Sequence, residues 1–136
     1  MAYAVRISFA LALAATAPAP AAAQPDCGYY QYKARITSVY DGDTVRADID
    51  LGFDIWRHDE PLRLYGIDTP EVRGDERPAG LDARDALRER IEGKDVTICT
   101  IRDGTGKYGR YLAIIWDGEE NVNEWLVASG YAVPYN

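Results

Sequence analysis

LDARDALRERIEG, residues 81 to 93, is a helical stretch set among segments that favour strands. Its apolar residues Ala83, Ala86, Leu87 and Ile91 recur at helical spacing, so they predict a helix. Gly93 follows the last of them and is typical of the residue that ends a helix. The place of this helix in the order of the strands decides between the β-rich folds.

Strand patterns lie on both sides of the helix. They are rich in aromatic and β-branched residues, or they alternate apolar with polar positions as half-buried strands do. Three precede the helix and two follow it, at residues 29–40, 44–51, 62–67, 94–101 and 110–116. The first three are expected to form a meander. The polar residues 73–80 are predicted to be a loop, because glycine and proline punctuate them.

A second, short helix is predicted at VNEWLVAS, residues 122–129, where Gly130 ends it. Asn121 or Asn123 is its candidate N-cap. Five strands with a helix between the third and the fourth match the order of an OB-type barrel. We therefore predict a β-rich α+β domain: a five-stranded OB-fold barrel with a helix between strands 3 and 4 and a short C-terminal helix.

The start of the chain is predicted to lie outside this domain. Arg6 precedes an apolar run that ends in small residues at Ala23, which is the pattern of a secretory signal peptide. The run is too short, and too interrupted by proline, to span a membrane. We therefore expect a signal peptide at 1–23 and one domain at 24–136. The mature protein is expected to be secreted or periplasmic, monomeric and free of the membrane.

Charge and cysteine content restrict the binding partners and the cellular compartment expected for the protein. The formal net charge of −7 would repel nucleic acid unless a cation or a local basic patch intervenes. The two cysteines, Cys27 and Cys99, suggest one disulfide in an oxidising compartment. The alternative is two unpaired thiols.

Several kinds of site are excluded because their residues are missing. His58 is the only histidine, which rules out multi-histidine metal sites. Neither Ser38 nor Ser129 lies in a nucleophile-elbow motif. GTGKYGR, residues 104–110, lacks the hydroxyl residue and the glycine spacing of a phosphate loop. Carboxylate and arginine chemistry remains, with a hard cation such as Ca²⁺ or Mg²⁺ if a metal binds.

Three motifs lie at the ends of predicted strands: DGDT (41–44), RLYGIDTPE (63–71) and KYGR (107–110). Alone, DGDT favours a simple β-turn. Together the motifs supply four acids and two arginines, namely Asp41, Asp43, Asp68, Glu71, Arg63 and Arg110. Clustered acids repel one another unless a divalent cation neutralises them, and arginine forks suit phosphate.

In this order, around five strands, the motifs resemble those of the thermonuclease (staphylococcal nuclease-like) family. VNEWLVASGYA also resembles the helical segment near the C-terminus of that family, so the resemblance covers residues 36–135. The chain looks like a secreted bacterial homologue. The resemblance implies an OB-fold and Ca²⁺-dependent hydrolysis of phosphodiester bonds in single-stranded or frayed DNA and in RNA.

The resemblance also implies a calcium site. Asp43 and Asp68 would be direct ligands, and the backbone carbonyl of Thr69 would be a third. Asp41 would hold metal-bound water in the outer shell.

The remaining roles concern the phosphate and the attacking water. Glu71 matches the general base of the family, and Arg63 and Arg110 match its phosphate-binding arginines. Weaker matches for substrate binding are Lys107, Tyr108 and Tyr135. The first and fourth strands of an OB barrel are neighbours, which supports a disulfide between the two cysteines.

Two departures from the family pattern stand out. The longer segment between the first two motifs places Phe53 and Trp56 on an extended hairpin, where packing within the hairpin is favoured over stacking on bases. The final helix of the family is expected to be missing. Two other function classes stay open: a non-catalytic OB-fold module that binds nucleic acid, and a Ca²⁺-stabilised structural domain. The structural domain would leave both arginines without a role.

Overall fold

The computed structural model describes residues 27, 30–105 and 109–135. The expected leader, Lys107 and Tyr108 lie outside the described residues. In chain order the elements are β1 (Gln31–Val39), β2 (Thr44–Asp50), β3 (Trp56–Leu64), β4 (Ile67–Asp68), η1 (Gly74–Glu76), α1 (Arg77–Ile91), β5 (Asp95–Thr105), β6 (Tyr111–Asp117), β7 (Glu120–Asn121), α2 (Val122–Ala128) and β8 (Val133–Pro134).

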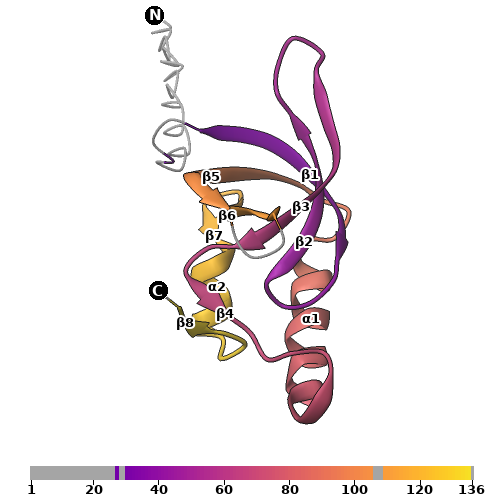
Figure 1. The fold of residues 1–136 in the computed structure, drawn as a ribbon, viewed down its shortest axis with the longest axis vertical. Helices are drawn as coiled ribbons and strands as arrows, with labels where there is room; N and C mark the ends of the chain where they lie inside the picture. Colours follow the sequence, from indigo (N-terminus) through magenta and orange to yellow (C-terminus); the bar gives the residue numbers. More distant parts are fainter. Residues whose placement is uncertain (1–26, 28–29, 106–108, 136) are drawn as a thin grey trace, which may run out of the picture.

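Five of these strands close into a barrel. The sheet order is β3-β2-β1-β5-β6-β7, and β3 pairs with β6 in parallel, which joins the two sides. The first three strands form the expected meander, and α1 lies between the third and fourth barrel strands, β3 and β5. Figure 1 shows both helices below the barrel strands, away from the tip of the β2–β3 hairpin. The predicted five-stranded OB-fold is confirmed.

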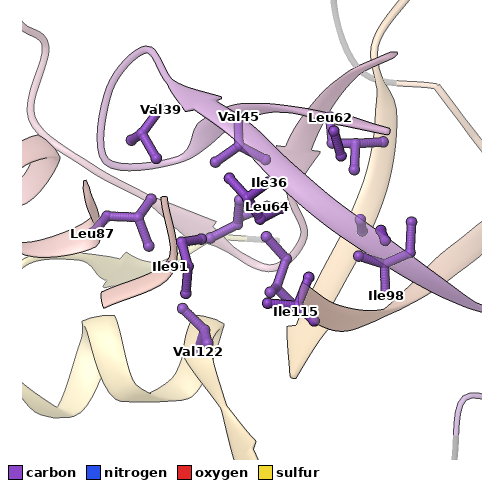
Figure 2. Packing of buried hydrophobic residues seen from close by; sticks show 14 of the residues in the cluster. Ile36, Val39, Val45, Leu62, Leu64, Leu87, Ile91, Ile98, Ile115 and Val122 are labelled. Carbon is purple, nitrogen blue, oxygen red and sulfur yellow. The ribbon is translucent and has the colours of Figure 1, made fainter. Parts of the chain in front are cut away.

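One hydrophobic core fills the barrel and extends to both helices. Figure 2 shows side chains from the strands, from α1 and from α2 pointing toward one another. The largest fully buried side chains are Ile36, Leu62, Leu64, Leu87, Ile91, Ile98, Ile115, Leu126, Val39, Val45 and Val122. Each such side chain favours the folded state by about 1.5 to 3 kcal/mol relative to an exposed one.

The third strand differs from its predicted bounds at both ends. It starts at Trp56, within the segment expected to be a connection, and it ends at Leu64. The chain then turns at Tyr65 and Gly66, where Gly66 has a φ of +75° that favours glycine. The early start escaped prediction because the first residues of β3 are mostly exposed and show no alternation. Pairing with β2 makes them a strand.

The first helix is longer than predicted. It begins at Arg77, and η1 precedes it, so the prediction of a loop over 73–80 is wrong. Proline fits the first turn of a helix because its missing N–H would have no partner there. The predicted end is confirmed: Gly93, at φ +75°, follows the C-cap residue Glu92.

Of the two candidate caps of α2, Asn121 is the N-cap and accepts a hydrogen bond from the backbone N–H of Glu124 at 3.2 Å. Asn123 is buried instead and joins α2 to the barrel. Its side chain accepts from the N–H of Ile115 at 3.1 Å and donates to the carbonyls of Ala113 at 3.1 Å and Tyr65 at 2.9 Å. It therefore holds α2 both to β6 and to the turn after β3.

The hairpin between β2 and β3 exposes apolar side chains. Phe53 is 98% exposed, so the expectation that it packs within the hairpin is wrong. Trp56 stacks on His58 with 6.3 Å between ring centroids, as expected for packing within the hairpin. Among the described residues, no helix is both long and apolar enough to cross a bilayer.

The predicted disulfide between Cys27 and Cys99 is present, with 5.1 Å between the Cα atoms and a sequence separation of 72 residues. It ties the residues before β1 to β5, the strand that pairs with β1. A Cys27→Ser/Cys99→Ser variant is expected to lose about 3 kcal/mol of unfolding free energy, because the bond no longer restricts the unfolded chain. Urea denaturation measures this. Reduction of the native protein should cause a similar loss, and an unchanged midpoint after reduction would contradict the expectation.

Candidate active site

Strand register brings DGDT, RLYGIDTPE and the described end of KYGR to one end of the barrel. Thr44 is paired with Arg63 across β2 and β3, and Arg63 is paired with Leu112 across β3 and β6. Arg110 lies two residues before Leu112, immediately before β6. Closure of the barrel therefore places both predicted phosphate-binding arginines beside the DGDT turn.

Asp43 is the centre of a hydrogen-bonded cluster, with a side chain only 7% exposed. Its Oδ2 atom lies 2.7 Å from Nη1 of Arg63 and accepts from the N–H of Thr69 at 3.3 Å. Its Oδ1 atom accepts from the hydroxyl of Thr44 at 3.1 Å. Both carboxylate oxygens are thus engaged, as a buried charge requires.

Arg63 bridges two predicted metal ligands. Besides Asp43, its guanidinium contacts Oδ1 of Asp68 at 3.1 Å. Residues 63 and 68 would fall on opposite faces of an ideal strand, but the turn at Gly66 interrupts the strand and lets their side chains meet. Tyr135 lies beside this arginine, with its ring centroid 5.9 Å from the guanidinium carbon.

The charge of Arg63 is secured by its partners. Burial works to lower the pKa of Arg63, but the hydrogen bonds and charges of Asp43 and Asp68 outweigh burial and raise it.

Tyr135 is held in place by its N–H, which donates to the carbonyl of Gly66 at 2.9 Å. The short pair of β4 with β8 precedes it and places Val133 beside Asp68.

Asp41 is buried close to Asp43. Its Oδ1 atom accepts from the N–H of Asp43 at 3.1 Å. Burial, followed by the charge of Asp43, raises the pKa of Asp41 from 3.8 to about 6, although hydrogen bonds from Asp43 and Thr44 act in the other direction. Each of two adjacent buried carboxylates makes ionisation of the other less favourable, and such a pair favours a bound cation.

Asp41→Asn is expected to stabilise the calcium-free protein at neutral pH. The folded protein holds the Asp41 proton more tightly than the unfolded chain. Ionisation of Asp41 therefore lowers the free energy of unfolding as the pH rises from about 4 to about 6. Removing the charge should raise the unfolding free energy at pH 7 by about 2 kcal/mol. Urea denaturation at several pH values measures it, with the exposed Asp54→Asn as control. An unchanged pH slope would contradict the prediction.

Gly42, in the DGDT turn, allows close packing around the site. A Cβ on Gly42 would lie 2.8 Å from the side chain of Thr69 and 2.9 Å from Ala83 of α1, which is too close. The turn, the Thr69 segment and α1 therefore pack in direct contact. A side chain at position 42 would force them apart.

Glu71 lies on the exposed loop after the cluster. Its N–H donates to Glu76 at 3.1 Å, and in the described part of the chain no hydrogen bond or ion pair joins its carboxylate to the Asp43 cluster. The loop is fixed from the other side by Gly80 of α1, because a Cβ there would overlap the backbone of Pro70 and Glu71. The backbone of Glu71 is positioned, while its carboxylate faces solvent.

Thr44 joins Arg110 to the cluster and was not singled out from the sequence. Nη1 of Arg110 donates to the hydroxyl of Thr44 at 2.9 Å. The sequence feature that could have indicated Thr44 is a hydroxyl residue directly after the two acids of DGDT. The motif was interpreted from its carboxylates alone. Of the predicted site, the structure brings together Asp41, Asp43, Arg63, Asp68, Thr69, Arg110 and Tyr135.

Comparison with known proteins assigns the family. A family model described as "Staphylococcal nuclease homologue" matches residues 61–136. The chain belongs to this family. The thermonuclease of Staphylococcus hyicus is 32% identical over 101 residues, which is 72% of this chain and 56% of that protein. The thermonuclease of Staphylococcus intermedius is 34% identical over 100 residues, or 71% of this chain and 56% of that protein.

Membership of the staphylococcal nuclease homologue family confirms the resemblance inferred from the three motifs. The family match covers RLYGIDTPE, KYGR and the α2 segment, while the DGDT turn lies before it. The chain spans about half the length of these curated relatives, at 56% of each.

Proposed function

We propose that this protein is a Ca²⁺-dependent nuclease that hydrolyses phosphodiester bonds of single-stranded or frayed DNA and of RNA. One observation carries the proposal: two arginines meet a buried carboxylate cluster at the end of the barrel, through Arg63 on Asp43 and Arg110 on Thr44. Arginine forks at such a position suit the phosphate of a nucleic acid. The curated relatives named above are thermonucleases, which supports the same activity here.

The residues around Asp43 fit a hard cation. Asp43 and Asp68 would hold Ca²⁺ directly with the carbonyl of Thr69, and Asp41 would hold its water. The raised pKa of Asp41 supports this, because burial and the nearby charge of Asp43 both disfavour the ionised carboxylate, and a bound cation would offset that cost. Among the described residues no three His, Cys, Asp or Glu side chains are grouped as metal ligands. Instead Arg63 contacts both Asp43 and Asp68, so a cation would compete with Arg63 for these carboxylates.

In this mechanism, Arg63 and Arg110 hold the scissile phosphate and offset the charge that develops on its oxygens. Glu71 accepts a proton from the attacking water, a role suited to an exposed carboxylate on a fixed loop. Ca²⁺ held by Asp43 and Asp68 would supply further positive charge near the phosphate and would lower the pKa of water bound to it. Tyr135, beside Arg63, contributes to substrate binding, and the same role is proposed for Lys107 and Tyr108.

Export is part of the proposal. Residues 1–23 act as a signal peptide, and residues 24–136 form the mature domain, secreted or periplasmic and monomeric. The Cys27–Cys99 disulfide supports an oxidising compartment.

The direct test is cleavage of a labelled single-stranded oligonucleotide by the protein expressed without residues 1–23. We expect cleavage with Ca²⁺ and none with a chelator. Calorimetric titration of Ca²⁺ should show binding that Asp68→Asn weakens by about tenfold or more. Binding of the oligonucleotide without cleavage would instead identify a non-catalytic OB-fold module. Ca²⁺ binding that raises the melting temperature, with no affinity for the oligonucleotide, would identify a structural domain.

A further inference from the structure

We propose that Thr44 is a positioning residue for the reaction, because its hydroxyl links the carboxylate of Asp43 to the guanidinium of Arg110. The inference rests on the proposed function, since it concerns the same site. It assigns a role to a side chain that neither holds a metal nor accepts the proton of the attacking water.

The geometry defines the direction of both hydrogen bonds. Arg110 lies 2.9 Å from the Thr44 hydroxyl oxygen, and that oxygen lies 3.1 Å from Oδ1 of Asp43. A guanidinium only donates and an ionised carboxylate only accepts, whereas a hydroxyl has one hydrogen and two lone pairs. The hydroxyl therefore accepts from Arg110 and gives its own hydrogen to a carboxylate, either Asp43 or the adjacent Asp41, whose pKa a hydrogen bond from Thr44 also lowers. At 8% exposed, Thr44 is shielded from water that would compete for either bond.

The place of Thr44 in the barrel explains why a link is useful here. Thr44 is the first residue of β2, and Arg110 immediately precedes β6. These two strands are not neighbours in the sheet, because β3 lies between them. The hydrogen bond between Arg110 and the Thr44 hydroxyl therefore joins two segments that flank β3.

Through this link both arginines are placed relative to one carboxylate. Arg63 contacts Oδ2 of Asp43 directly, and Arg110 reaches Oδ1 through Thr44. The separation of the two guanidinium groups is then set before a phosphate arrives. Pre-organised charge of this kind acts on the transition state without reorganisation at the moment of reaction.

The competing explanation is that Thr44 only fills space and satisfies its own hydroxyl. Three variants separate the two. Thr44→Val keeps the shape and β-propensity but removes the hydroxyl, Thr44→Ser keeps the hydroxyl, and Thr44→Ala removes the hydroxyl with less bulk if the valine variant fails to fold. We expect Thr44→Val and Thr44→Ala to lower kcat by about 10- to 100-fold with a smaller change in KM, and Thr44→Ser to restore activity to within about threefold.

A double-mutant cycle tests whether Thr44 acts through Arg110. If it does, Thr44→Val should cost little in an Arg110→Lys background, because the positioned group is already altered. Equal losses of kcat in the native and Arg110→Lys backgrounds would overturn the proposal. So would equal kcat values for Thr44→Val and Thr44→Ser.

A second readout does not depend on cleavage. Side-chain ¹⁵N NMR signals of Arg110 should show restricted guanidinium rotation in the native protein and in Thr44→Ser, but faster rotation in Thr44→Val and Thr44→Ala. The signals of Arg63 should stay unchanged, because Asp43 and Asp68 hold it. If the native protein has no Ca²⁺-dependent cleavage, the proposed function fails while this measurement still decides the Thr44 link. Unchanged Arg110 rotation in Thr44→Val would overturn the link.

Discussion

Arg63→Gln is expected to lower kcat/KM on single-stranded DNA by about 10³-fold, because the variant loses a charged fork on the phosphate in the transition state. The same variant is expected to bind Ca²⁺ more tightly than the native protein in the absence of substrate. The reason is that Arg63 contacts both Asp43 and Asp68 and so competes with the cation for these carboxylates. Steady-state kinetics and calorimetric titration of Ca²⁺ measure the two effects.

The opposite signs make this prediction specific. A general loss of folding would lower both activity and Ca²⁺ affinity. Removal of a competing arginine instead raises Ca²⁺ affinity while activity falls. Arg46→Gln is a matched control, because Arg46 pairs with Asp59 on the exposed face of the barrel. It should leave both values within about twofold, as surface ion pairs contribute little. Weaker Ca²⁺ binding by Arg63→Gln would show that the arginine organises the carboxylates instead of competing for them.

Glu71→Gln is expected to lower kcat by about 10² to 10⁴-fold, the usual contribution of a general base. Glutamine has the size of glutamate but cannot take the proton from the attacking water. Because Glu71 is exposed and its carboxylate is outside the Asp43 cluster, the melting temperature and Ca²⁺ affinity should stay unchanged.

Asp75→Asn provides the control for Glu71→Gln, since it removes a charge from the neighbouring η1 without touching the proposed base. Its kcat should stay within about twofold of the native value, as for most surface substitutions. Undiminished cleavage by Glu71→Gln would exclude Glu71 as the general base. The charge of the arginines and of Ca²⁺ would then have to account for the rate without it.

The sequence was sufficient for those features that depend on local patterns. Apolar residues at helical spacing predicted α1, and Gly93 predicted its end. The order of strands around that helix predicted the barrel, because few β-rich folds place a single helix there. The place of DGDT and RLYGIDTPE at the ends of predicted strands indicated that acids and arginines would meet, and the strand register brings them together.

Features that depend on tertiary context escaped prediction. The first half of β3 is a strand only because β2 pairs with it, and its own residues carry no alternating pattern. Asn123 satisfied the sequence rule for a helix cap, but the carbonyls of Ala113 and Tyr65 hold it in the interior. The link through Thr44 requires β6 to lie beside β3, a long-range parallel pairing that no local pattern encodes.

The parallel pairing of β3 with β6 also bears on folding. It joins segments almost fifty residues apart in sequence, from Leu62 with Tyr111 to Leu64 with Ala113. Contacts this distant are costly to form early, because the intervening chain must first be ordered. Arg63 and Arg110 approach each other only when this seam is complete. A chain that is newly made, partly folded or held open would therefore carry every proposed catalytic residue and still have no site with which to cut nucleic acid.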